Sequence, residues 1–193
     1  MNLLSLLRLT ARRADSLSRV LKERYYVEDI TPGMLRRMGI EAVILDHDGV
    51  LGPSLSLAPD AAGLELLRVT LQVFGPGRVF VLSNTRSRRN SREKAYHEAL
   101  PEIVYIKAKR KPDGEGLAIA SSASGIPKEK FGVIDDGMLT GILMAVEHGA
   151  RPVYAVRRNL SESLMAKVFR LGTTVPQMLA VSVSGLFCGP VER

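Results

Sequence analysis

The sequence predicts an α/β fold with a mostly parallel, five-stranded sheet and helices on both of its faces. Two observations support this prediction. Between residues 40 and 156, short apolar runs alternate with longer segments of helical periodicity, which is the repeated strand–helix unit of such folds. The chain has 193 residues, of which 46% are hydrophobic and 24% are charged, so it has the length for one globular core and some appended segments.

Each element is predicted from its own residues. The strands are apolar runs too short for helices, at 42–46, 78–83, 103–107, 131–135 and 152–156. The helices occupy the intervals, at 59–73, 86–99, 113–124 and 139–148. Because parallel strands are joined by crossover helices, the carboxyl ends of all strands lie at one edge of the sheet, and we expect the functional loops there.

The chain divides into three predicted parts. Residues 1–30 form a basic amphipathic helix and a linker, and residues 31–158 form the core. Pro32 and Gly33 mark the boundary between these two parts. Residues 159–193 form a C-terminal extension to which we assign no role.

The first part of the chain is basic, because residues 1–24 carry six basic and two acidic residues. Wound as a helix, they place apolar side chains on one side, at Leu3, Leu6, Leu7, Leu17 and Leu21. The opposite side carries Arg8, Arg12, Arg19 and Lys22. Three interpretations stay open: the helix lies on an anionic membrane, packs on the core, or belongs to a mitochondrial transit peptide. No apolar run reaches the roughly 18 residues of a spanning helix, so we expect peripheral membrane contact without a transmembrane segment.

The remaining composition narrows the partners. With 27 Lys and Arg against 20 Asp and Glu, the net charge of +7 favours an anionic partner, such as a phosphorylated substrate, an anionic lipid or a nucleic acid. Aromatic residues make up only 5% and Trp is absent, which argues against a stacking platform for nucleic acid. The single cysteine, Cys188, excludes an internal disulfide and a cysteine-based zinc site, and favours a reducing compartment.

Polar side chains follow four of the predicted strands. In chain order they are Asp46 and Asp48, Ser83 and Asn84, Lys111, and Asp135 and Asp136. Because the strands are parallel, these side chains are expected to converge at one edge of the sheet. Carboxylates and a backbone carbonyl are hard oxygen ligands for Mg²⁺, whereas Lys, a hydroxyl and backbone N–H groups neutralise phosphate oxygens. The sequence therefore predicts a site for a phosphoryl group and Mg²⁺.

The series DHDGV, VLSNT, KRKP and VIDDGMLT, with each member at a strand end, resembles the four motifs of the haloacid dehalogenase (HAD) superfamily of phosphohydrolases. Over residues 25–157, the stretches YVEDITPGMLRRMGIEAVILDHDGVL, YIKAKRKP and FGVIDDGMLTGILMAVEHGA are similar to the YqeG-type branch, which includes mitochondrial phosphatidylglycerophosphate phosphatases. This resemblance implies a Rossmann-like HAD fold and a hydrolase of phosphoric monoesters.

The resemblance also implies roles for single residues. Asp46 would be the nucleophile that forms an aspartyl-phosphate, and Asp48 would be the general acid and then the general base. Asp46, the carbonyl of Asp48, and Asp136 would hold Mg²⁺. The residues implied to bind the substrate phosphate are Ser83, Asn84 and Lys111.

The fourth motif departs from the pattern of the branch, which is GDxxxTD. The Gly that precedes the metal ligand is Asp135 here, and the later acidic residue is Gly141. Either Asp135 replaces the missing carboxylate as a further metal ligand, or metal binding is weaker. His47, between the two carboxylates of the first motif, is expected to pack or to shape the substrate site rather than to bind metal.

The intervals between the motifs are too short for a cap domain, so we expect a capless, open site that suits a headgroup presented by a membrane, or a macromolecule. The leading prediction is a peripheral membrane phosphatidylglycerophosphatase of phospholipid biosynthesis. It would be cytoplasmic, or in the mitochondrial matrix if residues 1–24 are a transit peptide. The alternatives are a capless phosphatase of a soluble, protein or nucleic-acid phosphoester, and a non-catalytic phosphate- or RNA-binding module.

Overall fold

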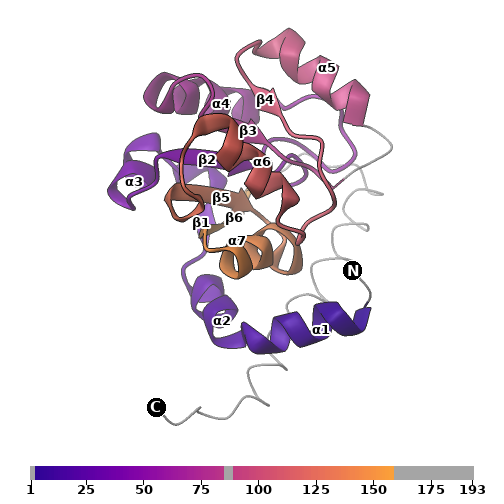
Figure 1. Ribbon diagram of the computed structural model, residues 1–193. Coiled ribbons are helices and arrows are strands. Elements are labelled where there is room, and N and C mark those ends of the chain that lie inside the picture. Colours follow the sequence, from indigo (N-terminus) through magenta and orange to yellow (C-terminus); the bar gives the residue numbers. More distant parts are fainter. Residues whose placement is uncertain (1–2, 85–88, 159–193) are drawn as a thin grey trace.

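A single parallel sheet organises the computed structural model, which describes residues 3–84 and 89–158 (Figure 1). The strand order is β1-β6-β5-β2-β3-β4, and all paired strands are parallel. The strands are β1 (Tyr25–Tyr26), β2 (Ala42–Leu45), β3 (Val79–Val81), β4 (Val104–Tyr105), β5 (Phe131–Asp135) and β6 (Arg151–Val156). The α/β class and the parallel sheet are therefore confirmed.

The sheet has six strands rather than the five predicted. The additional strand is β1, which pairs with β6 through Tyr25 and Tyr26 and extends the sheet by one edge strand. Two residues are too few for alternation of apolar and polar side chains to be seen in a sequence, so this segment was predicted to be linker. Pairing with the neighbouring strand, rather than local pattern, makes these residues extended.

The four predicted crossover helices are present. The helices are α1 (Leu3–Arg12), α2 (Ala14–Lys22), α3 (Pro32–Arg37), α4 (Ala61–Phe74), α5 (Arg89–Ala99), α6 (Glu115–Ser124) and α7 (Leu143–His148). Short 3₁₀ turns lie at Val27–Asp29 and Lys128–Lys130, and a π-helical turn at Met138–Ile142 leads directly into α7. Local sequence explains several ends: the Asp60 side chain caps α4 by accepting from the Gly63 N–H, and Gly149 ends α7 in the left-handed conformation.

Side chains of successive strand residues point to opposite faces of the sheet, and each face has its own core. Val43 and Leu45 belong to the cluster that α3, α4 and α5 cover, whereas Ala42 and Ile44 belong to the cluster that α6 and α7 cover. All four residues of β2 are buried. This central position on the sheet explains why the strand is an uninterrupted apolar run.

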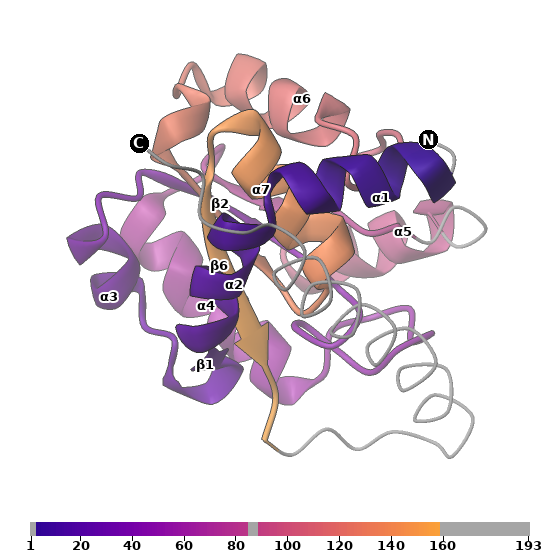
Figure 2. The same cartoon turned by 90° about the horizontal axis from the view of Figure 1, so that it is seen from below.

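The N-terminal segment forms two helices instead of the single helix predicted. The helical conformation breaks at Arg13, whose φ and ψ are −109° and 11°. Figure 2 shows α1 beside α7, with α2 turning toward β6. The break lets Leu6 and Leu9 of α1 and Leu17 of α2 pack against one cluster formed by α7, the preceding π-helical turn and β6.

Packing on the core, which was one of three open interpretations, is thus what the structure shows for part of this segment. Leu17 is fully buried, and burial of a leucine side chain stabilises the fold by about 1.5–3 kcal/mol. Arg13 donates from Nε to Glu147 Oε2 over 2.8 Å, and Arg12 also pairs with Glu147. Two leucines of α1 stay exposed: Leu4, of which 66% is accessible, and Leu7, of which 45% is accessible.

Two further predictions concern residues that the structure does not describe. The C-terminal extension, residues 159–193, lies outside the described residues, as does the predicted start of the helix at 86. Among the helices of the described ranges, none combines the length and the apolar character that a membrane span requires.

Candidate functional site

The carboxyl ends of the two central strands bring three aspartates together. Asp46 directly follows β2, Asp135 is the last residue of β5, and Asp136 follows it. The backbone of the first site residue is anchored in the sheet, because the Asp46 N–H donates to the Ile134 carbonyl over 2.9 Å. One carboxylate oxygen of each aspartate lies within 4.8 Å of the other two. The predicted convergence of the first and fourth motifs is therefore present.

Lys111 joins this group from the loop after β4. Its Nζ lies 2.8 Å from Asp46 Oδ1 and 2.5 Å from Asp135 Oδ2, and it also donates to the Leu82 carbonyl over 3.2 Å. The side chain is almost fully buried. Its backbone is fixed as well, because the Lys111 N–H donates to the Asn84 side-chain oxygen over 2.7 Å. Among the described lysines that follow β4, Lys111 thus contacts Asp46 and Asp135, whereas Lys107 pairs with Glu93.

Two glycines give the carboxylates their space. Gly49 has a φ of +83°, and a Cβ on it would lie 2.0 Å from Asp136 Oδ2. A Cβ on Gly141 would lie 2.0 Å from Asp135 Oδ2. Any side chain at either position would collide with an aspartate of the cluster. The glycine that follows DHD in the sequence is therefore required for close approach to the fourth motif.

The charges of this cluster are unbalanced. Burial raises the pKa of Asp46 to about 7, with the neighbouring Asp135 and Asp48 adding to the rise against the opposing charge of Lys111. Burial and the charges of Asp135 and Asp46 raise the pKa of Asp136 well above its usual value. Burial alone would lower the pKa of Lys111, but Asp135 and Asp46 hold it above its usual value. One ammonium does not neutralise three carboxylates.

A divalent cation fits this excess of negative charge. Hard oxygen donors within a few ångströms of each other are the ligands that Mg²⁺ takes, and a cation would return the raised pKa values of Asp46 and Asp136 toward the ionised range. The donor set offered by the described residues is Asp46, Asp135 and Asp136. Three of the four residues predicted to hold the metal, Asp46, Asp135 and Asp136, are thus together, whereas the predicted contribution of the Asp48 carbonyl stays a prediction.

Asp48 lies on the other side of the site and has different partners. Arg92 donates to both of its oxygens, from Nη2 to Oδ1 over 2.7 Å and from Nη1 to Oδ2 over 2.9 Å. The Leu55 N–H adds a bond to Oδ1 over 3.1 Å, and Ser83 Oγ adds one to Oδ2 over 3.3 Å. Burial alone would raise the pKa of Asp48, but the hydrogen bonds and charge of Arg92 outweigh it and hold the pKa below its usual value.

Three functional-site residues were not predicted from the sequence: Arg92, Tyr96 and Ser56. Tyr96 Oη lies 2.7 Å from His47 Nδ1, and Ser56 Oγ lies 2.9 Å from His47 Nε2. His47 is fully buried with both ring nitrogens bonded, which agrees with the prediction that it packs. The one signal in the sequence was the spacing of Arg92 and Tyr96, which are four apart and lie on one face of α5.

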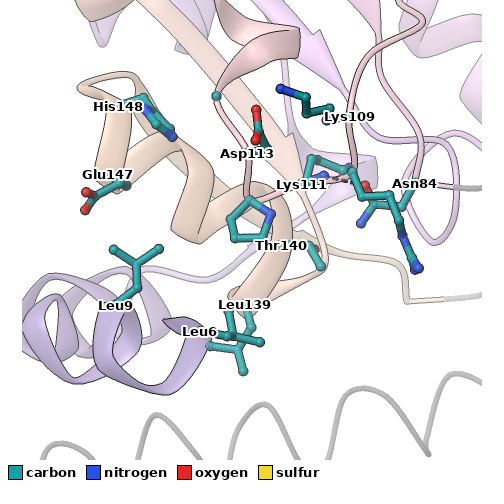
Figure 3. A pocket seen from close by; sticks show the side chains of 13 residues that line it. Leu6, Leu9, Asn84, Lys109, Lys111, Asp113, Leu139, Thr140, Glu147 and His148 are labelled. Carbon is teal, nitrogen blue, oxygen red and sulfur yellow. Dashed lines mark hydrogen bonds between the residues drawn. The ribbon is translucent and has the colours of Figure 1, made fainter. Parts of the chain in front are cut away.

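A cavity of about 670 Å³ borders the cluster through Asn84 and Lys111 (Figure 3). One wall is apolar and combines Leu6 and Leu9 of α1 with Leu139. The loop after β4 also lines the cavity and brings both basic residues, Lys109 and Arg110, and the acidic Asp113, while Glu147 lines it from α7. The cavity therefore combines apolar side chains with charged side chains of both signs next to the buried lysine.

Comparison of the chain with protein-family models, with curated proteins and with solved structures gave no match. The resemblance to HAD phosphohydrolases consequently rests on the four motifs and their order alone.

Proposed function

We propose that the protein is a Mg²⁺-dependent phosphomonoesterase with a Rossmann-like, capless HAD fold, acting through an aspartyl-phosphate on Asp46. One observation carries the proposal: Lys111 Nζ contacts Asp46 Oδ1 at 2.8 Å inside a buried cluster with Asp135 and Asp136. A carboxylate next to a buried ammonium and a set of metal ligands is arranged to meet an incoming phosphoryl group, whose charge the ammonium and the metal offset.

The bonds change in two displacements. In the first, a carboxylate oxygen of Asp46 forms a bond to phosphorus while the ester P–O bond breaks and the leaving oxygen takes a proton. In the second, water attacks the phosphorus, a proton leaves the water, and the Asp46–phosphorus bond breaks. Mg²⁺ would supply charge neutralisation to the phosphoryl oxygens.

Asp48 is the side chain placed to move these protons. Held ionised by Arg92, it is ready to accept the proton of the attacking water in the second displacement. To serve as the acid of the first displacement, it must first take up a proton. Lys111 would hold the phosphoryl oxygens against Asp46, with Ser83 and Asn84 completing the phosphate site.

We further propose an anionic amphiphile as the substrate, with phosphatidylglycerophosphate as the leading candidate and phosphatidylglycerol as its product. Support comes from the cavity beside Lys111, whose lining combines the apolar side chains of Leu6 and Leu9 with the basic Lys109. In the described ranges, the chain between Asp48 and Ser83 contributes α4 to the core, which leaves the site open to a headgroup. Such an enzyme would be peripheral to a membrane, in the cytoplasm or in the mitochondrial matrix.

Phosphate release tests the proposal. The purified protein is given a soluble aryl phosphate and phosphatidylglycerophosphate in vesicles, each with and without Mg²⁺. We expect Mg²⁺-dependent release, and a fall of roughly 10³-fold or more in Asp46→Asn, because the nucleophile is lost. Asp15→Asn, which changes an exposed aspartate of α2, is the matched control and should keep full activity.

The alternatives appear as distinct outcomes of this experiment. Hydrolysis of the aryl phosphate without hydrolysis of the lipid would favour a soluble, protein or nucleic-acid phosphoester as the substrate. Near-normal turnover in folded Asp46→Asn would refute the covalent mechanism. Binding of phosphate with no turnover of any ester would favour the non-catalytic module.

A further inference from the structure

Two side chains of helix α5 bind the loop that carries the first motif. Arg92 and Tyr96 lie one turn apart on this helix and both side chains are fully buried. Tyr96 bonds to His47, and Arg92 bonds to the next residue, Asp48. Two consecutive residues of the loop are therefore held by two consecutive turns of one helix.

Arg92 connects the two motif side chains on this side of the site. Its guanidinium binds both oxygens of Asp48, at 2.7 and 2.9 Å, and its Nη1 also donates to Ser83 Oγ over 2.5 Å. Its Nε donates to the Ser56 carbonyl over 3.0 Å. The Ser83 hydroxyl in turn donates to Asp48 Oδ2. Arg92, Asp48 and Ser83 thus form a closed triangle of hydrogen bonds.

Fold stability alone does not explain an arginine at this place. Removing a guanidinium from water is costly, and buried ion pairs are often no more stabilising than well-packed apolar side chains. An apolar residue would fill the same side of α5, which packs against the apolar cluster through Tyr96. What only arginine provides is a planar fork that fixes a carboxylate and a hydroxyl in one orientation.

We propose that Arg92 is a positioning residue that fixes the carboxylate of Asp48 and the hydroxyl of Ser83 relative to each other and to the phosphoryl site. The inference rests on the proposed function, because Asp48 and Ser83 are the side chains expected to move the proton and to hold a phosphoryl oxygen. Arg92 itself acts only through these two partners.

The test compares Arg92→Met, Arg92→Lys and the control Lys94→Gln. Methionine keeps much of the length of the side chain without its donors, and lysine keeps the charge without the fork. Lys94 lies on the same helix with 78% of its side chain exposed, so Lys94→Gln removes a positive charge away from the site. With a soluble aryl phosphate and Mg²⁺, we expect kcat to fall at least 30-fold in Arg92→Met, with KM within about threefold of the original.

A second readout separates positioning from a structural role. Beryllofluoride with Mg²⁺ mimics the aspartyl-phosphate, and ¹⁹F spectra of the complex report the donors around its fluorines. We expect the bound ¹⁹F signals to shift in Arg92→Met, because Ser83 loses its fixed orientation, and to shift less in Arg92→Lys. Spectra are recorded well below the unfolding temperature of each variant, so that only folded protein is compared.

A kcat in Arg92→Met within twofold of the original protein, together with unchanged ¹⁹F signals, would overturn the inference. If Arg92→Met does not fold, the decision falls to Arg92→Lys: a normal kcat with normal ¹⁹F signals in that variant would overturn it equally. If the unchanged protein neither hydrolyses an ester nor binds beryllofluoride with Mg²⁺, the proposed function itself fails, and this inference fails with it.

Discussion

Asp135 and Gly141 share one volume at the edge of the sheet. A Cβ on Gly141 would lie 2.0 Å from Asp135 Oδ2 and 2.3 Å from its Cγ, so the carboxylate of Asp135 occupies the place where a side chain at 141 would begin. From there Asp135 reaches Lys111 Nζ at 2.5 Å and accepts from the Gly137 N–H at 2.7 Å. The carboxylate of Asp135 and a side chain at position 141 therefore exclude each other.

This geometry predicts the behaviour of an exchange between the two positions. Asp135→Gly removes one of the two carboxylate partners of the buried Lys111, and Gly141→Asp places a side chain against Asp135, so each single variant should lose activity. Gly141→Asp should also lose about 1–3 kcal/mol of stability through overpacking. The double variant, D135G with G141D, should recover at least tenfold in activity over either single variant. Rates at several Mg²⁺ concentrations and urea unfolding measure both effects. Simple additivity of the two losses would contradict the shared position.

His47 predicts a pH dependence of stability. Its burial, reinforced by the charge of Arg92, lowers its pKa to about 4. Between this value and the ordinary pKa of about 6.5, the unfolded chain binds a proton that the folded protein does not, so stability is complete above pH 6.5 and falls as the pH falls toward 4. This difference between the folded and unfolded pKa corresponds to a contribution on the order of 3 kcal/mol. Asp46, whose pKa is raised to about 7, takes up a proton on folding over the same range and opposes this loss, so the test is the difference between two proteins. From pH 7 to pH 4, urea unfolding should show the original protein losing stability relative to His47→Gln; equal slopes in both proteins would refute the assignment.

A site residue could be predicted from the sequence where strand topology brings its partners to it, and could not where a helix face does. Asp46 and Asp135 end strands of a parallel sheet, so topology alone brings them together. Arg92 lies in the first turn of α5 and reaches Asp48 across 44 positions of sequence, and only its spacing from Tyr96 sets it apart from the exposed Lys94 two residues later. The direction of a helix face toward a particular loop is a tertiary property that periodicity does not encode.

At the scale of elements, α1 and α2 combine a packing role with an exposed apolar surface. Sequence periodicity identified the amphipathic character, but not the break at Arg13, because the break depends on where α7 and β6 offer apolar surface. Leu17 is buried in the core, whereas Leu4 and Leu7 are exposed. A test of membrane contact must therefore alter the exposed leucines and leave the core intact.

The expected result separates the two roles of the segment. Leu4→Ser with Leu7→Ser should lower activity on phosphatidylglycerophosphate in anionic vesicles at least fivefold, with little change on a soluble aryl phosphate, because the exposed leucines supply surface residence and none of the chemistry. Leu17→Ser is the matched variant in the core; it should lower thermal stability and reduce both activities together. Equal losses on both substrates in the Leu4 and Leu7 variant would show that α1 serves the fold alone.

At the scale of the whole molecule, the sheet separates two edges that carry basic side chains. Lys109 and Arg110 are exposed at the carboxyl edge, beside the cavity and the cluster of aspartates. Arg78 and Lys130 are exposed at the amino edge, where each directly precedes a strand. Basic side chains that contribute to the net charge of +7 thus lie both at the edge that holds the site and at the opposite edge.

If the carboxyl edge faces an anionic membrane, position should matter more than net charge. Lys109→Gln with Arg110→Gln and Arg78→Gln with Lys130→Gln each remove two positive charges, but only the first pair lies beside the site. Each basic residue near an anionic surface contributes roughly 1 kcal/mol, so the first variant should lose about tenfold or more in vesicle affinity and the second should lose little. Sedimentation with phosphatidylglycerol-containing vesicles measures this, and neutral vesicles serve as the control. Binding of the original protein should weaken with added salt, since charges are screened beyond about 8–10 Å at physiological ionic strength. Equal losses in the two variants would mean that vesicle binding depends on the total charge and not on the carboxyl edge of the sheet. The orientation proposed for the site would then be wrong.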